Sequence, residues 1–152
     1  MTALRVTPIS MTGYALYRDE TAVFLSFAYV LVALPLTGLL PPTLLPAVVP
    51  AAILSGLMAP IFALTLATFA SNKVEGLALM KGLGTLMLGP LAACFIEAAW
   101  QPLFGILPTY WPAKALWVAG EDGKFWPYVL AGAAYNLLLT VLLLRRFREK
   151  VF

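Results

Sequence analysis

The sequence predicts an all-α integral membrane protein, a helical bundle, and two observations carry this prediction. The first is composition: 62% of the 152 residues are hydrophobic and only 11% are charged, with a mean hydropathy of +0.91. Soluble domains average about 45–50% apolar and about 25% charged residues. The second is a run, residues 21–70, that contains no Asp, Glu, Lys or Arg. A soluble globular protein and a disordered chain are therefore excluded.

The charge-free run is long enough for two membrane spans. As one helix it would extend about 75 Å at about 1.5 Å per residue, more than twice a hydrocarbon core of about 30 Å. A turn is expected at residues 40–43 (LPPT), because proline lacks an N–H and the residue before it avoids the α region. We expect spans over residues 21–40 and 44–70. The second carries three prolines that predict a tilt, a kink or a short interfacial piece before it (Pro46, Pro50 and Pro60).

Two further spans are expected in the second half of the chain. Residues 82–101 form an apolar run whose only charge is Glu97, and residues 125–144 form the last span. Residues 102–124 between them are too polar and proline-broken to cross, yet they carry Trp and Tyr residues that favour the membrane interface. We expect this outer connection to be re-entrant or interfacial. Residues 145–152 form a basic tail.

Lys and Arg are distributed unequally across the predicted membrane. If four spans cross it, eight of the ten Lys and Arg residues lie on the side of the two termini, and only Lys114 and Lys124 lie on the other. Cytoplasmic segments carry the excess of Lys and Arg. The pattern predicts both termini in the cytoplasm and the chain in the plasma (inner) membrane. The four basic residues of the tail flank an apolar run, so they predict contact with a lipid membrane and no nucleic-acid partner.

The residue inventory excludes most enzyme chemistry. The chain has no His, and its single Cys, Cys94, can form neither an intramolecular disulfide nor a zinc cage. No catalytic or metal-binding set is expected. Gly84 and Gly89 have the glycine spacing of a phosphate-binding loop, but Pro90 stands where that loop needs lysine. We therefore expect a chain that is no enzyme and binds no cofactor itself.

Residues 1–20 form the most informative segment outside the predicted spans. Thr7 followed by Pro8 predicts a helix start, with threonine as the N-cap and proline at the first helical position. The helix would run to Arg18 on the cytoplasmic face. Two interpretations remain open: an interfacial helix that leads into the first span, or a docking surface for a cytoplasmic partner.

Several segments resemble the permeases of type-2 ABC exporters, in the order in which that family has them. Residues 4–10 (LRVTPIS) and 14–18 (YALYR) are similar to the family's cytoplasmic loop between the second and third spans. Residues 67–81 (ATFASNKVEGLALMK) resemble the link between the fourth and fifth spans. Residues 105–114 (GILPTYWPAK) resemble the outer loop before the last span. Within the family, the segments look most like the permeases described as fluoroquinolone-export permeases.

The resemblance implies a membrane permease subunit that exports hydrophobic or amphipathic compounds such as drugs. It implies an ABC ATPase subunit as partner, which would bind ATP and Mg²⁺, and a second permease copy in a homo- or heterodimer. The N-terminal helix would be a coupling helix that docks on the ATPase through four residues (Thr7, Pro8, Tyr14 and Arg18). The family has six spans and this chain supplies only the last four, so a truncated part of a permease or a shortened relative is expected.

Two polar residues inside the predicted spans are candidate substrate or polar sites. Glu97 lies past the midplane of its span, and an intramembrane acid is a candidate for pairing with a cationic substrate or a proton. The alternative is that the span ends or turns back near Ala93 and leaves Glu97 hydrated. Asn136 needs a polar partner, which another helix or a ligand would supply. Five aromatic residues are expected to offer apolar surface to a substrate (Phe24, Phe27, Tyr29, Phe62 and Phe95).

A second function class fits the same topology. A self-contained four-span protein could act as a membrane scaffold or accessory subunit with no transport activity. It predicts no ATPase partner and tolerance of changes in the N-terminal helix. A membrane enzyme would need clustered polar residues on facing spans, and the sequence shows none. The export permease is the function we expect.

Overall fold

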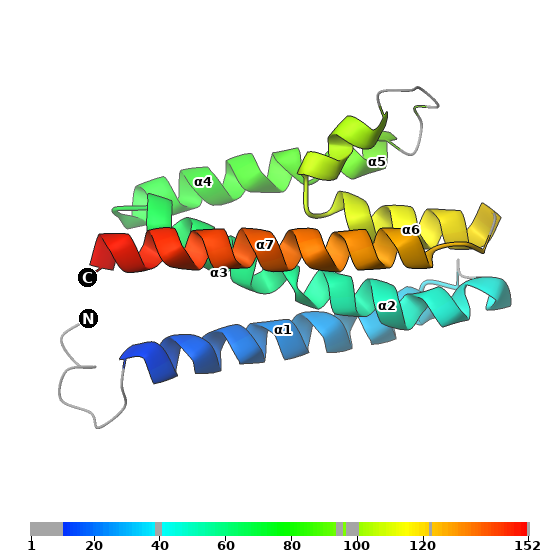
Figure 1. The fold of residues 1–152 in the computed structure, drawn as a ribbon, viewed down its shortest axis with the longest axis horizontal. Coiled ribbons are helices and arrows are strands. Elements are labelled where there is room, and N and C mark those ends of the chain that lie inside the picture. The colour runs from blue at the N-terminus through cyan, green and yellow to red at the C-terminus, as the bar shows by residue number, and fades with distance from the viewer. Residues whose placement is uncertain (1–10, 39–40, 94–95, 97–100, 122, 152) are drawn as a thin grey trace.

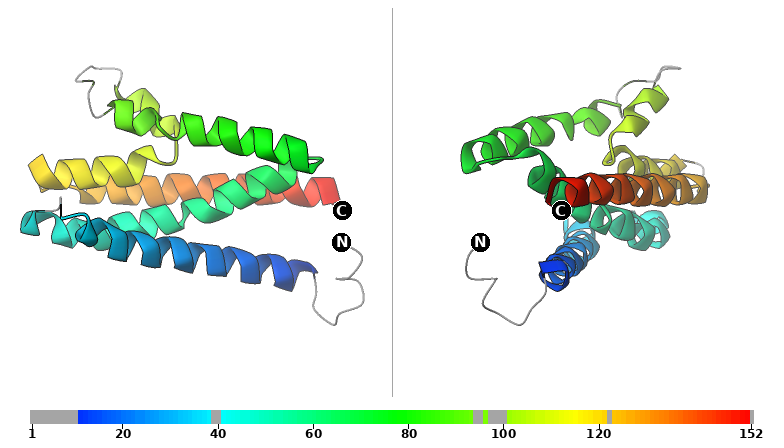
Figure 2. Two further views of the ribbon diagram at one scale, coloured as in Figure 1. Left: turned by 180° about the vertical axis from the view of Figure 1, so that it is seen from behind. Right: turned by 60° about the vertical axis from the view of Figure 1, so that its left-hand side comes forward.

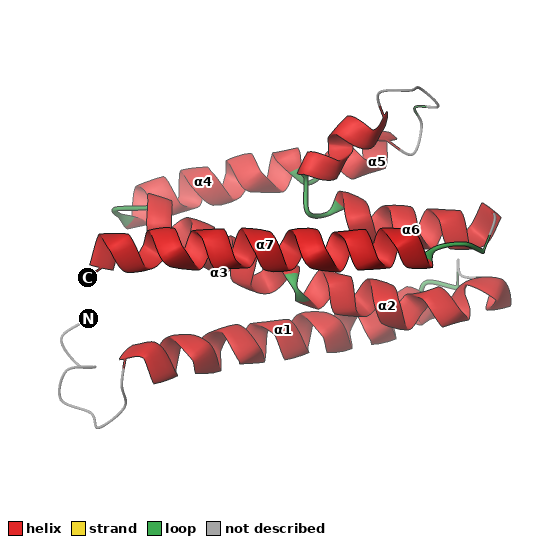
Figure 3. Cartoon of the chain, in the orientation of Figure 1, coloured by secondary structure: helices red, strands yellow, loops and turns green. Residues whose placement is uncertain are grey.

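The computed structural model describes residues 11–38, 41–93, 96, 101–121 and 123–151. Within these ranges the chain forms helices and no strand, which confirms the predicted all-α bundle (Figure 3). The long helices run side by side along the molecule, and the start of α1 and the end of α7 lie at the same end of the bundle (Figure 1). An even number of passes along the bundle produces this arrangement.

The first helix, α1 (Met11–Leu36), is longer than the first expected span. We expected a coupling helix within residues 1–20 and a separate span over residues 21–40, whereas the described chain is one helix from Met11 onward. The hydroxyl of Thr21 donates to the Tyr17 carbonyl oxygen at 2.7 Å, across the expected boundary. The helix is followed by Gly38 at φ 67°, a left-handed conformation that glycine adopts without strain.

The second expected span is broken into two helices, as its prolines predict. After the 3-10 turn η2 (Pro42–Leu44), α2 (Leu45–Gly56) and α3 (Met58–Phe69) meet at Leu57. Pro60 has no N–H to donate to the Gly56 carbonyl, which weakens the helix at this point. Gly56 also lets α1 approach closely, because a Cβ there would lie 3.0 Å from the Val23 carbonyl oxygen. We call this break the Leu57 joint.

The third expected span differs most from the structure. We expected one helix over residues 82–101, but α4 (Lys73–Leu86) starts nine residues earlier in the chain and ends before α5 (Gly89–Ala93). The early start has a local cause: the Asn72 side chain accepts from the Glu75 N–H at 2.9 Å, and Glu75 accepts from the Ser71 N–H at 2.8 Å. This reciprocal pairing is a capping box.

The expected outer connection, residues 102–124, is mostly helical. It contains the 3-10 helix η3 (Gln101–Ile106) and α6 (Tyr110–Glu121), which leads through Gly123 to α7 (Trp126–Val151). In Figures 1 and 2, α6 lies along only one half of α7. It packs against both α2 and α7, so this segment is part of the bundle as well as a connection between spans.

Two helical stretches of the described chain are long and apolar enough to cross a membrane: Pro42–Phe69 and Trp126–Lys150. Glu20–Leu36 is a shorter apolar helix within α1. By contrast, α4 lies on the far side of α3 and α7 from α1 and has no buried residue (Figure 2). The bundle therefore has a packed part, α1 to α3 with α6 and α7, and one helix that is nearly uncovered.

The hydrophobic core lies where α2, α6 and α7 meet. Its fully buried members include Ala47 and Leu54 of α2 and Ala115 of α6. Phe125 and Val129, at the start of α7, are 8% exposed and complete the cluster. Small residues at these contacts let the helix backbones approach closely, which is how helices associate where no water drives them together.

The closest approach in this core is at Gly132 of α7. A Cβ at Gly132 would lie 2.5 Å from the Trp111 Cβ and 3.3 Å from Leu54 Cδ2. We expect Gly132→Ala to lower the free energy of unfolding by about 1–3 kcal/mol, because both helices must move apart. Denaturant titration of the full chain in micelles measures this effect.

A matched control is Gly84→Ala in α4, where an added Cβ would have no neighbour within 4 Å. Alanine is the better helix former, so this change should leave stability unchanged or raise it by up to about 1 kcal/mol. Equal losses from the two substitutions would contradict the packing described here.

Candidate functional site

An open groove of about 600 Å³ lies between α1, the Leu57 joint and α6. One wall is α1, with Tyr29 and Leu34 among its residues. The floor consists of residues on both sides of the Leu57 joint, and the opposite wall belongs to α6. The lining combines two aromatic rings with hydroxyl-bearing and small or aliphatic residues (Tyr29, Phe62, Ser26, Ser55, Thr109, Pro112 and Ala113).

The groove has an apolar lining despite its hydroxyl groups. The Ser55 hydroxyl donates to the Ala51 carbonyl oxygen at 2.9 Å, within its own helix. The Thr109 hydroxyl is 3.4 Å from the Met87 carbonyl oxygen, which it faces as a weak donor. Among the described residues, the lining includes no Asp, Glu, Lys or Arg. The groove thus suits a compound with an apolar or aromatic body, which is the usual character of small-molecule sites.

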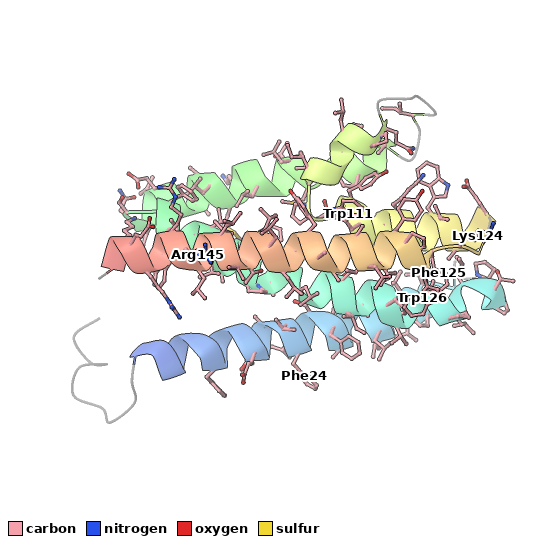
Figure 4. All side chains as sticks on the ribbon, viewed as in Figure 1. Phe24, Trp111, Lys124, Phe125, Trp126 and Arg145 are labelled. Carbon is pink, nitrogen blue, oxygen red and sulfur yellow. The ribbon has the colours of Figure 1, made fainter. Side chains whose placement is uncertain are left out.

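The predicted aromatic surface lies only partly in the groove. Tyr29 and Phe62 line it. Phe24 points away from the bundle and is 67% exposed (Figure 4). Phe27 lies at the α1–α2 contact, with its Cβ 3.5 Å from the position that a Cβ of Gly56 would take. Phe95 lies outside the described residues.

The α6 wall was not predicted as part of a site. We expected residues 102–124 at the membrane surface because of their polarity and prolines. Three of the four buried residues in α6, Pro112, Ala115 and Val118, follow each other at intervals of three, which is close to one helical turn and is the missed signal. Trp111 holds this wall in place: its indole N–H donates to the Gly105 carbonyl at 3.1 Å, and its ring lies 5.9 Å from that of Tyr135.

Asn136 lies in the core and not in the groove. It is fully buried in α7, and its amide N–H faces the Leu54 carbonyl oxygen of α2 at 3.4 Å. Its Oδ1 has no hydrogen-bond partner among the residues that the structure describes. The partner we required for this residue is therefore backbone from another helix. The contact joins α7 to the last turn of α2, just before the Leu57 joint.

The remaining predicted site residues are placed only in part. Thr7, Pro8 and Glu97 lie outside the described residues. Tyr14 and Arg18 fall within α1, of which the structure describes the backbone at these positions. The structure thus brings no described pair of predicted site residues together, but it joins the docking segment to one wall of the groove through a single helix.

A polar network connects Ala93 and Ile96 to α6. The Gln101 amide donates to the carbonyl oxygens of Ala93 at 2.9 Å and Ile96 at 3.1 Å. The same side chain accepts from Lys114 Nζ at 3.0 Å, and this cation lies 4.1 Å from the ring centroid of Trp117. The Gln101 side chain thus joins the carbonyl oxygen of Ala93, the last residue of α5, to Lys114 of α6.

The fold is that of a helical membrane protein with an apolar groove between α1, the Leu57 joint and α6. The comparisons with known proteins specify the class further. The chain belongs to the family described as fluoroquinolones export permease protein Rv2686c-like, whose family model matches residues 1–144. This match confirms the resemblance to exporter permeases noted in the sequence.

Two relatives from Mycobacterium tuberculosis are 42% identical to the chain over 151 residues, which is 99% of it. They are the fluoroquinolones export permease protein MT2760 of strain CDC 1551 / Oshkosh and the fluoroquinolones export permease protein Rv2686c of strain H37Rv. The chain spans 60% of the length of these relatives. No solved structure matches the chain.

The environment of Asn136 gives a testable prediction. Asn136→Leu removes one long hydrogen bond but also an unpaired buried oxygen, so we expect a change in unfolding free energy within about 1 kcal/mol, since hydrogen bonds between membrane helices average about 0.6 kcal/mol. Asn136→Asp would place an acid at the same buried position and should cost about 2.5–3.5 kcal/mol.

Denaturant titration of both variants in micelles provides the measurement. If Asn136→Leu is the more damaging of the two, the hydrogen bond to α2 is stronger than the structure indicates.

Proposed function

We propose that the chain is a permease subunit, or part of one, of an ATP-driven ABC exporter that moves hydrophobic or amphipathic compounds, fluoroquinolones included, out of the cell. Family membership supports the export class, and the groove supports the kind of compound. A volume of about 600 Å³ lies within the range of about 300–1,000 Å³ of small-molecule pockets. The aromatic rings of Tyr29 and Phe62 offer surfaces for a fused aromatic ring system.

The observation that carries this proposal is the continuity of α1. The helix contains Tyr14 and Arg18 of the predicted docking segment and, from Leu25 to Leu34, one wall of the groove. Its 26 residues extend about 39 Å. A displacement of its N-terminal end therefore moves the groove wall, because a continuous helix transmits force along its axis.

The energy source is proposed to be a separate ABC ATPase. This chain contains no phosphate-binding loop of the required sequence, so ATP and Mg²⁺ would bind to the partner subunit. In this proposal the ATPase contacts the N-terminal segment through Thr7, Pro8, Tyr14 and Arg18. Both termini then face the cytoplasm, in agreement with the distribution of Lys and Arg, and the chain lies in the plasma (inner) membrane.

Further membrane helices are proposed to complete the bundle. The helix α4 has no buried residue and exposes apolar side chains, including Val74, Leu77 and Met80. A helix of this kind is stable in a membrane but is available for packing. Helices of a second permease copy, or additional spans such as the longer relatives have room for, would cover it.

Glu97 keeps a role in the proposal as a candidate contact for a cationic compound. Four positions along the chain from Glu97, the Gln101 side chain contacts Ala93 and Lys114 of α6. Glu97→Gln should reduce export of cationic compounds and leave neutral ones unaffected. If this variant exports cationic compounds as well as the native chain does, Glu97 does not have this role.

The proposal is tested in the organism that carries the gene. Deletion should raise the cellular accumulation of a fluoroquinolone, and the native chain should restore the original level. Phe62→Ala and Arg18→Ala should each fail to restore it, the first because the groove loses an aromatic surface and the second because the ATPase contact is lost. Phe24→Ala is the matched control, since this ring points away from the bundle.

Fluoroquinolone binding to the purified chains distinguishes the two variants. The purified Phe62→Ala chain should bind the fluoroquinolone at least about fivefold more weakly than the native chain, and Arg18→Ala should bind it normally. If deletion leaves accumulation unchanged, the export function is wrong and a scaffold or accessory role takes its place.

A further inference from the structure

The outward face of α7 carries a continuous stripe that ends in arginine. Its members follow each other at intervals of three or four residues, the spacing of one helix face. All of them are exposed, and the stripe runs from an aromatic residue through apolar ones to two cations (Trp126, Leu130, Ala134, Leu138, Val141, Arg145 and Arg148). Figure 4 shows Trp126 near one end of α7 and Arg145 near the other.

The length of the stripe matches a bilayer. Trp126 and Arg145 are 19 positions apart in the chain, which corresponds to about 28 Å along the helix axis, close to the hydrocarbon thickness of about 30 Å. Tryptophan favours one membrane interface, and arginine near a helix end reaches the phosphates of the other. In the leaflet at the C-terminal end of α7, the acyl chains therefore contact Leu138 and Val141, and the headgroups contact Arg145.

The end of α7 is held firmly enough to present its cations. Lys150 Nζ donates to the Thr68 carbonyl oxygen at 2.7 Å, which ties the end of α7 to the last turn of α3. Within the described residues, Arg145, Arg146 and Arg148 form no ion pair or hydrogen bond. Glu149 is the one acid among the last seven described positions of α7. The three guanidinium groups thus carry uncompensated charge at the level of the headgroups.

We propose that this stripe binds an anionic phospholipid, with its phosphate on Arg145 and Arg148 and an acyl chain along Val141 and Leu138. Planar guanidinium groups bind phosphate oxygens through paired N–H donors. A second copy of the chain fits this face poorly: two copies inserted in the same orientation would bring the stripe against itself about a two-fold axis and place Arg145 against Arg145.

The test is lipid binding to the purified full chain, measured by native mass spectrometry with phosphatidylglycerol and phosphatidylcholine of the same acyl chains. The native chain should bind the anionic lipid several-fold more tightly. Arg145→Gln should reduce that preference about fivefold and the double variant Arg145→Gln/Arg148→Gln further, since one cation near an anionic surface is worth about 1 kcal/mol. Added salt should weaken the preference as it screens the charges.

Two controls make the result specific to the site. Lys124→Gln removes an exposed cation at the opposite end of the bundle and should leave the preference unchanged (Figure 4). Arg145→Lys/Arg148→Lys keeps the charge and should restore most of the preference.

Three outcomes would overturn the proposal. One is equal binding of the two lipids, and another is an equal loss of preference in Lys124→Gln and Arg145→Gln. The third is a symmetric cross-link at Leu138→Cys in a Cys94→Ser background, which would assign the stripe to a second copy.

Discussion

The contact of Trp111 with Gly132 is the interaction on which the rest of this bundle depends. It sets the distance between α6 and α7, and Leu54 of α2 lies close to the same point of the glycine. Because α6 also packs against α2, this contact fixes where α6 lies between the two helices. The core at Ala115 and the α6 wall of the groove belong to this packed segment. Glycine inside a helix weakens that helix locally. Here the glycine allows α6 and α7 to pack closely, as small residues do between membrane helices.

The groove and the break in the second span have a common origin. Proline at position 60 interrupts the helix near Leu57, and residues on both sides of this joint form the floor between α1 and α6. Asn136 ties α7 to the last turn before the joint. Bending at the joint would therefore change the shape of the groove and the contact with α7 together. The groove thus has a continuous helix, α1, as one wall and the jointed α2–α3 as its floor.

The sequence was sufficient for the helical class and for the membrane environment, because both follow from charge-free apolar runs. It was also sufficient to place the break near the prolines of the second span. It did not reveal α6 as a packed helix, since its proline and polar residues resemble those of a loop and its packing depends on tertiary contacts with α2 and α7. We expected the third span to begin at residue 82, where the apolar run begins, but α4 begins at Lys73 because Asn72 and Glu75 form a capping box. The burial of Asn136 depends on a backbone group 82 positions away, which no local pattern contains.

We propose that α1 connects the ATPase contact to the groove as one stiff helix. Its most direct test interrupts the helix between the two, by replacing Thr21 and Ala22 with glycine in a permease reconstituted with its ATPase. Fluoroquinolone binding should persist, while stimulation of ATP hydrolysis by the bound compound should be lost. Thr21→Ala, which keeps the helix, should retain both. Full stimulation in the glycine variant would contradict the claim, because coupling would then reach the groove by a path other than α1.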